Sequence, residues 1–186
     1  MTAAESTSTL TPPVSDIDHA QGPAHAKVTL VEYGDYECSY CGRAYTIVKQ
    51  LQDEMGMQMR FVFRNFPLSE AHPNALHAAI AAEAVGAHGE DEFWQMHDTL
   101  FEHQDALEDE DLAAYAEEIG IPGTEVTDAF RGGELADRVH ADFRGGVRSG
   151  VNGTPTFFVN GERFDGDWSD VQALLTAVRH AARPQR

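Results

Sequence analysis

The chain contains only two cysteines, Cys38 and Cys41, and they stand between a strand pattern and a helix pattern. The apolar, β-branched run at 27–33 predicts a central strand that is covered on both faces. After the cysteines, apolar residues recur at helical spacing up to Met55, and Gly56 predicts the end of that helix. The order strand, Cys-x-x-Cys, helix therefore places two thiols at a helix start, close to the end of a buried strand.

The remaining pattern predicts an α/β protein with a large helical part. Residues 59–66 read as a second strand, and a strand–helix–strand unit of this length joins parallel neighbours. Residues 69–149 are helical almost throughout, which is too long for a simple crossover. Strand patterns return at 156–160 and 162–164, separated by an Asn-Gly turn signal.

These segments predict a domain organisation. A flexible leader over 1–25 is expected from its Ser-, Thr- and Pro-rich composition. The α/β domain comprises 26–68 and 150–183, and 69–149 forms an inserted, all-helical subdomain. The last helix of the chain, in the α/β domain, is expected to begin with a capping box over 169–172.

Charge excludes one class of function. The formal net charge is -18, and no Lys or Arg occurs between Phe66 and Phe130, where 16 acidic residues lie. Such a surface repels polyanions, so nucleic acid is not an expected partner, and we interpret it as a solvated acidic face. No apolar run is long enough for a membrane span, and the N-terminus lacks the features of a signal peptide. The sequence thus predicts a cytoplasmic protein.

The cysteine spacing indicates redox chemistry. A thiol attacks as the thiolate, and a free cysteine has a pKa near ~8.5. The unpaired N–H groups and the positive dipole end of a helix start would stabilise a Cys38 thiolate. We therefore expect an exposed Cys38 to attack and a buried Cys41, one turn later, to resolve the mixed disulfide.

Two alternatives to a redox pair stay open. The cysteines could form half of a zinc site, which would need two more ligands, or they could be inert core thiols. Nine histidines are available, but none forms a spaced pair beside the cysteines. We assign no role to His72, His77 or His97, because structural or surface histidines are more common than ligands. A redox pair would need no bound cofactor.

The segment Gly153-Thr154-Pro155, directly before a strand pattern, is a second candidate. Proline cannot donate a ladder hydrogen bond, so its place at the first strand residue is unremarkable on its own. Read together with the cysteines, it predicts a cis Thr154–Pro155 bond. The proline ring would then pack against the disulfide and exclude metal, and the Thr154 backbone would be free to pair with an extended substrate.

Glu32 is the third candidate. It lies six residues before Cys38 and in phase with Val28 and Leu30, so its side chain should point into the core. Its predicted role is a buried proton acceptor for Cys41, which must lose a proton before it attacks the mixed disulfide. The alternative is a surface carboxylate at the strand end.

Three segments, at 32–41, 93–98 and 153–161, together resemble the DsbA-like thioredoxin family, and the similarity runs from about residue 24 to 178. The resemblance implies a thioredoxin fold with a helical insertion and dithiol–disulfide exchange with protein substrates. It also implies a catalytic pair at Cys38 and Cys41, a cis-proline at Pro155 and an acid at Glu32. Similar domains occur fused to membrane transporters.

Two departures from DsbA predict a weaker oxidant. DsbA has Pro-His between its cysteines, where this chain has Ser39 and Tyr40, so no histidine there assists the thiolate. The acids Glu37 and Asp35 lie near the nucleophile, and like charge raises a thiol pKa. The pKa of Cys38 is therefore expected below that of a free cysteine but above the ~3.5 of DsbA.

The predicted function is a thiol–disulfide oxidoreductase whose direction of catalysis is left open. Its expected partners are cysteine-containing proteins or a small thiol, and a redox partner that restores the cysteine pair. Cys38, Cys41 and Glu32 are the predicted catalytic residues, and the predicted substrate-binding residues are Thr154, Pro155, Ser39 and Tyr40. The alternative is a non-catalytic zinc- or peptide-binding module of the same fold.

Overall fold

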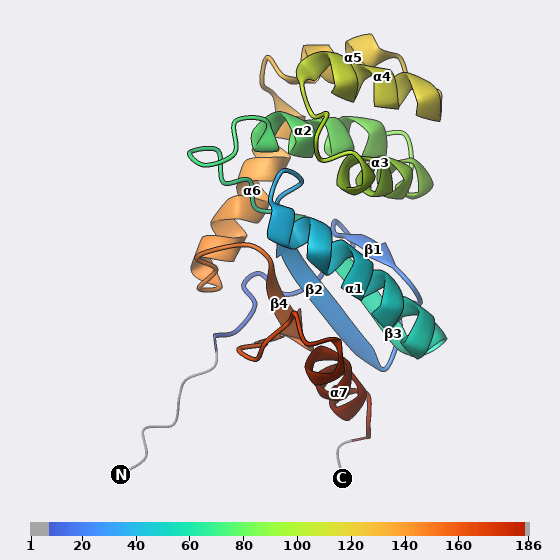
Figure 1. Cartoon of the computed structure of the whole chain (residues 1–186), viewed down its shortest axis with the longest axis vertical. Helices are drawn as coiled ribbons and strands as arrows, with labels where there is room; N and C mark the ends of the chain where they lie inside the picture. Colours follow the sequence, from blue (N-terminus) through green and yellow to red (C-terminus); the bar gives the residue numbers. More distant parts are fainter. Residues whose placement is uncertain (1–7, 185–186) are drawn as a thin grey trace.

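The computed structural model describes residues 8–184 and contains one five-stranded sheet (Figure 1). Across the sheet the strands follow the order β1-β3-β2-β4-β5. Their bounds are β1 His19–Gln21, β2 Val28–Gly34, β3 Met59–Asn65, β4 Thr156–Val159 and β5 Glu162–Arg163. β2 and β3 are parallel, as predicted, whereas β4 runs antiparallel to β2 and β5 antiparallel to β4.

The described chain has seven α-helices. A short 3-10 turn, Gly56–Gln58, joins the first helix to β3. The helices are α1 Ser39–Met55, α2 Ala75–Gly86, α3 Glu90–Glu102, α4 Asp109–Ile119, α5 Gly123–Ala129, α6 Glu134–Arg148 and α7 Val171–Ala181. Of these, α4 and α5 pack on other helices away from the sheet (Figure 1). The predicted fold class is confirmed: a thioredoxin-like α/β fold in which α2 to α6 follow β3 and precede β4.

The two faces of the sheet bury alternate residues of β2. Val28 and Leu30 lie in the larger core together with α1 and α7, which contact each other on this face. Val31 and Tyr33 lie in a second core on the opposite face, where α6 packs against β3. Because side chains alternate along a strand, Glu32 shares the face of Val28 and Leu30, as predicted.

Helix α6 approaches the sheet closely at a glycine. A Cβ atom at Gly146 would lie 2.6 Å from the ring of Phe66, so no larger residue fits there without a shift. Phe66 also stacks on Phe143 of the same helix, with ring centroids 4.3 Å apart. These contacts connect the helical part to the residue that follows β3.

The prediction of a flexible leader over 1–25 is wrong for the residues that the structure describes. Residues 19–21 form β1, which pairs antiparallel with β3. Arg64 binds the carboxylate of Asp18 at 2.7 and 3.0 Å and the carbonyl of Pro12 at 2.8 Å. These contacts are distant in sequence, so local composition did not predict them. Residues 1–7 lie outside the described part.

The capping box predicted for the last helix is also wrong. α7 begins after Asp170, whose carboxylate accepts hydrogen bonds from the amides of Gln172 and Ala173. The Ser169 hydroxyl donates to Asp167 at 2.6 Å instead. Both Ser and Asp are good N-cap residues. Because the Ser169 hydroxyl is bonded to Asp167, Asp170 caps the helix.

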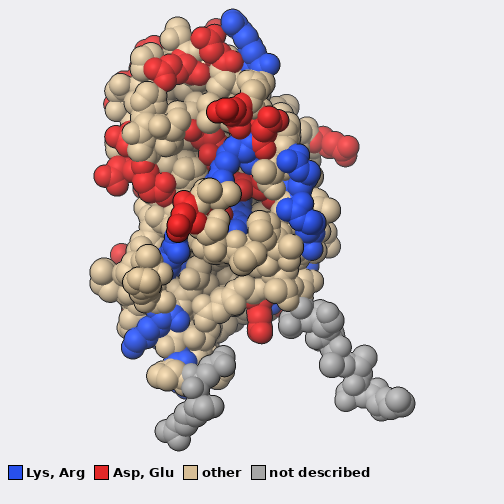
Figure 2. Space-filling model, turned by 180° about the vertical axis from the view of Figure 1, so that it is seen from behind, with Lys and Arg blue, Asp and Glu red and all other residues tan. Residues whose placement is uncertain are grey.

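Acidic side chains gather on the helical part of the molecule. Figure 2 shows them over its upper portion, where Figure 1 places α4 and α5. Some face histidines: Glu125 lies 2.7 Å from His88, and Asp109 lies close to His77. No helix in residues 8–184 combines the length and apolar character needed to cross a membrane.

Candidate active site

The two cysteines lie at the start of α1, where the sequence places them. Cys38 is the residue before the first helical turn, and Cys41 lies one turn later. Both are free thiols. Cys41 is fully buried, but Cys38 is only 4% exposed, so the prediction of an exposed nucleophile is wrong. The segment before β4 covers it, and the Cys38 sulfur lies 3.6 Å from the carbonyl oxygen of Thr154.

The surroundings of Cys38 favour its thiolate. Its pKa is lowered to about 5, first by a hydrogen bond from the Cys41 thiol. Burial opposes this effect, whereas the backbone amides of Tyr40 and Cys41 add to it. These amides belong to the first turn of α1, whose N–H groups have no partner within the helix. The value lies in the range expected from the sequence.

Cys41 has the opposite environment. Burial raises its pKa well above that of a free thiol, and the charges of Glu32 and Cys38 raise it further. The Asp35 amide, which donates to the Cys41 sulfur at 3.4 Å, opposes this rise only in part. The site therefore holds one thiol that ionises easily beside one that stays protonated, a division that suits sequential attack and resolution.

Glu32 lies inside the protein. It is 2% exposed, which excludes the alternative of a surface carboxylate. Burial, followed by the charge of Cys38, raises its pKa to about 8. Within the described residues its Oε1 atom has no hydrogen-bond partner. A carboxyl group with this pKa can give or take a proton near neutral pH.

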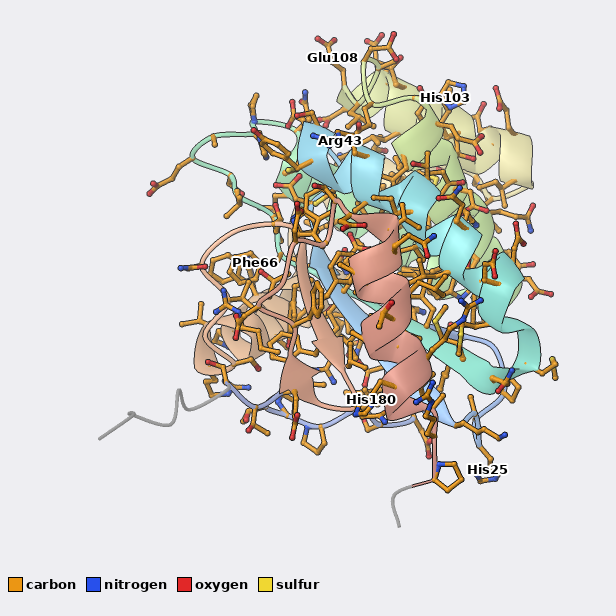
Figure 3. The ribbon with its side chains drawn as sticks, turned by 60° about the horizontal axis from the view of Figure 1, so that its bottom comes forward. His25, Arg43, Phe66, His103, Glu108 and His180 are labelled. Atoms are coloured by element: carbon orange, nitrogen blue, oxygen red, sulfur yellow. The ribbon has the colours of Figure 1, made fainter. Side chains whose placement is uncertain are left out.

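Thr154 and Pro155 border a hollow beside the cysteines. Their peptide bond is cis. The hollow has a volume of about 330 Å³, and Trp168 forms part of its wall. The guanidinium of Arg43, near the start of α1 in Figure 3, lies 5.9 Å from the centre of the Trp168 ring. The hollow thus combines an aromatic wall with the Thr154 backbone, whose carbonyl lies beside the Cys38 sulfur.

The two residues between the cysteines are exposed. Tyr40 is 58% exposed, which is unusual for an aromatic residue in this structure, and Ser39 is exposed as well. Both residues therefore lie at the surface next to the buried Cys38.

The two acids near Cys38 both have partners within the protein. Glu37 directs its carboxylate to Asn74, accepting from the backbone amide at 2.7 Å and from the side-chain amide at 3.2 Å. Asp35 accepts hydrogen bonds from four donors, and one of them is His72. Both carboxylates are satisfied by protein groups, and the pKa of Cys38 is lowered in their presence.

We expect Glu37→Gln to leave the pKa of Cys38 close to the wild-type value. The carboxylate is held by Asn74, and a glutamine side chain can still accept one of these hydrogen bonds. Thiolate absorbance against pH at low and high salt would measure the effect. A clear fall in the Cys38 pKa that salt diminishes would show that the Glu37 charge does reach the sulfur.

Two polar residues at the site were missed by the sequence analysis. Gln104 donates through Nε2 to the carbonyls of Tyr36 at 2.8 Å and Cys38 at 2.9 Å. His72, to which we assigned no role, lies with Nδ1 2.8 Å from Asp35. Each is far from the cysteines along the chain, and no local pattern links them.

No group of three histidine, cysteine or carboxylate side chains in residues 8–184 is arranged to hold a metal ion. The buried His97 instead pairs its Nδ1 with the Tyr36 hydroxyl at 3.0 Å and packs among aromatic rings. The zinc interpretation therefore gains no support from the described residues.

Comparison with known proteins identifies the family. The sequence model of a family described as Thioredoxin matches residues 15–177. The chain belongs to the thioredoxin family. Among solved structures, oxidised BdbD from Bacillus subtilis matches with a TM-score of 0.80 and 24% identity. This match covers 89% of this chain and 92% of the BdbD chain. Alpha-DsbA2 from Wolbachia pipientis has a TM-score of 0.74 at 23% identity, covering 89% and 88%. The fold is thus that of DsbA-like proteins.

Curated relatives are more similar in sequence but much longer. Na(+)/H(+) antiporter NhaA 1 of Salinispora arenicola is 46% identical over 171 residues, which is 89% of this chain and 25% of that protein. The NhaA antiporter of Herminiimonas arsenicoxydans is 40% identical over 179 residues, 95% of this chain and 28% of that protein. The chain spans about a quarter of the relatives it matches.

Proposed function

We propose that this thioredoxin-family protein is a thiol–disulfide oxidoreductase that uses Cys38 and Cys41 as its redox pair. The observation that carries the proposal is the division of acidity between the two thiols: the pKa of Cys38 is lowered to about 5, and that of Cys41 is raised. The likeness to alpha-DsbA2, described as a thiol-disulfide exchange protein, supports it.

The exchange proceeds in two steps that together move two electrons. A substrate thiolate attacks the Cys38 sulfur of the disulfide form, a new S–S bond forms, and the Cys38–Cys41 bond breaks. Cys41 leaves as a thiolate and takes a proton, for which the neighbouring Glu32 carboxyl is the proposed donor. A second substrate thiolate then attacks the substrate sulfur of the mixed disulfide and releases the Cys38 thiolate.

The low pKa of Cys38 favours oxidation of the substrate. A sulfur of low pKa is a good leaving group, so release of Cys38 from the mixed disulfide is fast. The same thiolate stabilises the dithiol form of the protein relative to its disulfide form. In the reverse direction Cys41 must lose its proton first, and Glu32 is then the proposed acceptor.

Cysteine-containing proteins or small thiols are the proposed substrates. The Thr154 backbone beside the sulfur can pair with an extended peptide, and the exposed Ser39 and Tyr40 would meet it. A further redox partner must return the cysteines to their disulfide form. The cytoplasmic location stays a prediction from the sequence, and ion transport named for the longer relatives is not proposed for this chain.

A redox equilibrium with glutathione tests the function. We expect Cys38 and Cys41 to form one disulfide in a two-electron transition, at a potential above the cytosolic glutathione poise of about -220 to -320 mV. Absorbance of the reduced protein should show a thiolate that titrates near pH 5. Stoichiometric zinc that blocks both thiols in the purified protein would instead favour a metal-binding module, and a Cys38 that titrates like a free cysteine would contradict the proposal.

A further inference from the structure

Asp35 contacts both cysteines through different atoms. Its backbone amide donates to the Cys41 sulfur at 3.4 Å, and its Oδ1 atom accepts from the Cys38 amide at 3.2 Å. The same oxygen accepts from the Glu37 amide at 2.8 Å. The carboxylate is 1% exposed and therefore has little contact with solvent that could screen its charge.

A buried anion at this place opposes the thiolate that the site stabilises. Like charges a few ångströms apart disfavour each other, and low solvent access strengthens this repulsion. The first turn of α1 attracts the Cys38 thiolate, but an uncompensated Asp35 beside the Cys38 amide would offset part of that effect. A compensating positive charge next to Asp35 would preserve it.

His72 is placed to supply that charge. Its Nδ1 atom lies 2.8 Å from Asp35 Oδ2, the oxygen that also accepts from the Leu68 amide at 2.9 Å. His72 belongs to the segment between β3 and α2, and a quarter of its side chain remains exposed, so it can exchange protons with solvent.

The charged groups around His72 favour its protonated form. Burial lowers its pKa, but the hydrogen bond and charge of Asp35, followed by the charges of Cys38 and Glu37, outweigh burial and raise it. Coupling between two titrating groups is reciprocal. A Cys38 thiolate that stabilises protonated His72 is itself stabilised by protonated His72 to the same extent.

We propose that His72 and Asp35 form a positioning pair in which the His72 imidazolium neutralises Asp35 and so holds Cys38 in its thiolate form. The proposal rests on the redox function proposed above. It gives this chain, which has no histidine between its cysteines, an imidazolium supplied from 34 residues further along the sequence. Asp35 orients the loop before α1, and His72 removes the electrostatic cost of having a carboxylate there.

The first experiment needs no substitution at the site. The pKa of His72 would be measured by NMR titration in the dithiol and disulfide forms of the intact protein. We expect a lower His72 pKa in the disulfide form, because oxidation removes the Cys38 thiolate. The same His72 pKa in both forms would overturn the proposal, because a purely structural histidine would not respond to the charge of Cys38.

Substitutions then separate the effect of the His72 charge from that of its hydrogen bond to Asp35. His72→Asn keeps a neutral donor for Asp35 and should raise the pKa of Cys38 by about one unit, which is the lower end for loss of a nearby opposite charge. The dithiol form should then lose stability relative to the disulfide by about tenfold in the glutathione equilibrium. Asp35→Asn in the His72→Asn background removes the uncompensated anion and should return the Cys38 pKa toward wild type.

His77→Asn is the matched control, because His77 forms a similar pair with Asp109 on the surface. It should leave the pKa of Cys38 unchanged. An unchanged Cys38 pKa in His72→Asn as well, with thermal unfolding showing a folded protein, would refute the pair. Thiolate titration does not require catalysis, so a protein that titrates as expected but exchanges no disulfides would refute only the proposed function.

Discussion

Cys38→Ser is expected to reduce thiol–disulfide exchange to the uncatalysed rate, whereas Cys41→Ser should accumulate mixed disulfides with substrate. Cys38 is the thiol whose pKa is lowered to about 5, so it is the sulfur that forms the first covalent bond. Without Cys41 the mixed disulfide has no internal thiol to resolve it. Non-reducing gels and mass spectrometry of the trapped species would identify the linked cysteine.

The choice of serine at position 41 matters for this experiment. The hydrogen bond from the Cys41 side chain is the largest cause of the low Cys38 pKa, and a serine hydroxyl can still donate it. Cys41→Ala removes the donor and should trap the same species more slowly at pH 6, because less Cys38 is ionised. Equal trapping through Cys41 in the Cys38→Ser variant, or turnover that survives in that variant, would contradict the assignment.

Much of the fold could be predicted because its strongest signals are local. The apolar runs of β2 and β3 and the helical spacing of α1 identify their own elements, and a helical crossover such as α1 is the usual connection between parallel strands. β1 has only three residues, and its stability comes from pairing with β3 and from the neighbouring contacts of Arg64. No periodicity of that length distinguishes a strand from a loop.

In the site too, features set by local sequence could be predicted, whereas contacts between distant segments could not. The largest cause of the low Cys38 pKa, the hydrogen bond from Cys41, was not predicted, but the helix-start amides that the sequence does predict also lower it. Strand alternation explains why the burial of Glu32 could be predicted. The loop before α2 brings His72 to Asp35, and the end of α3 brings Gln104 to the Cys38 carbonyl. Both contacts depend on how the helical part packs against the sheet, and the covering of Cys38 by Thr154 depends on the return of the chain to β4.

Glu32→Gln is expected to stabilise the reduced protein progressively as pH rises from 4.5 to 8. The pKa of Glu32 is raised from 4.5 to about 8, mainly by burial, so the folded protein binds this proton more tightly than the unfolded chain does. Wild type therefore has the full contribution below pH 4.5 and loses it as pH rises through 8. For wild type, the shift corresponds to a loss of up to about 5 kcal/mol in the free energy of unfolding. Glutamine does not ionise, so the variant does not lose this stability.

Urea unfolding of wild type and Glu32→Gln at pH 4.5 and pH 8.5 measures this change, and Glu118→Gln, at an exposed position, is the control. We expect the advantage of Glu32→Gln to be larger at pH 8.5 by a few kcal/mol, whereas the control difference stays constant. In stopped-flow kinetics the same variant should slow the steps in which the Cys41 proton moves more than the attack by Cys38. A pH-independent difference in stability would show that Glu32 ionises without penalty, and slowing of the attack alone would exclude proton transfer with Cys41.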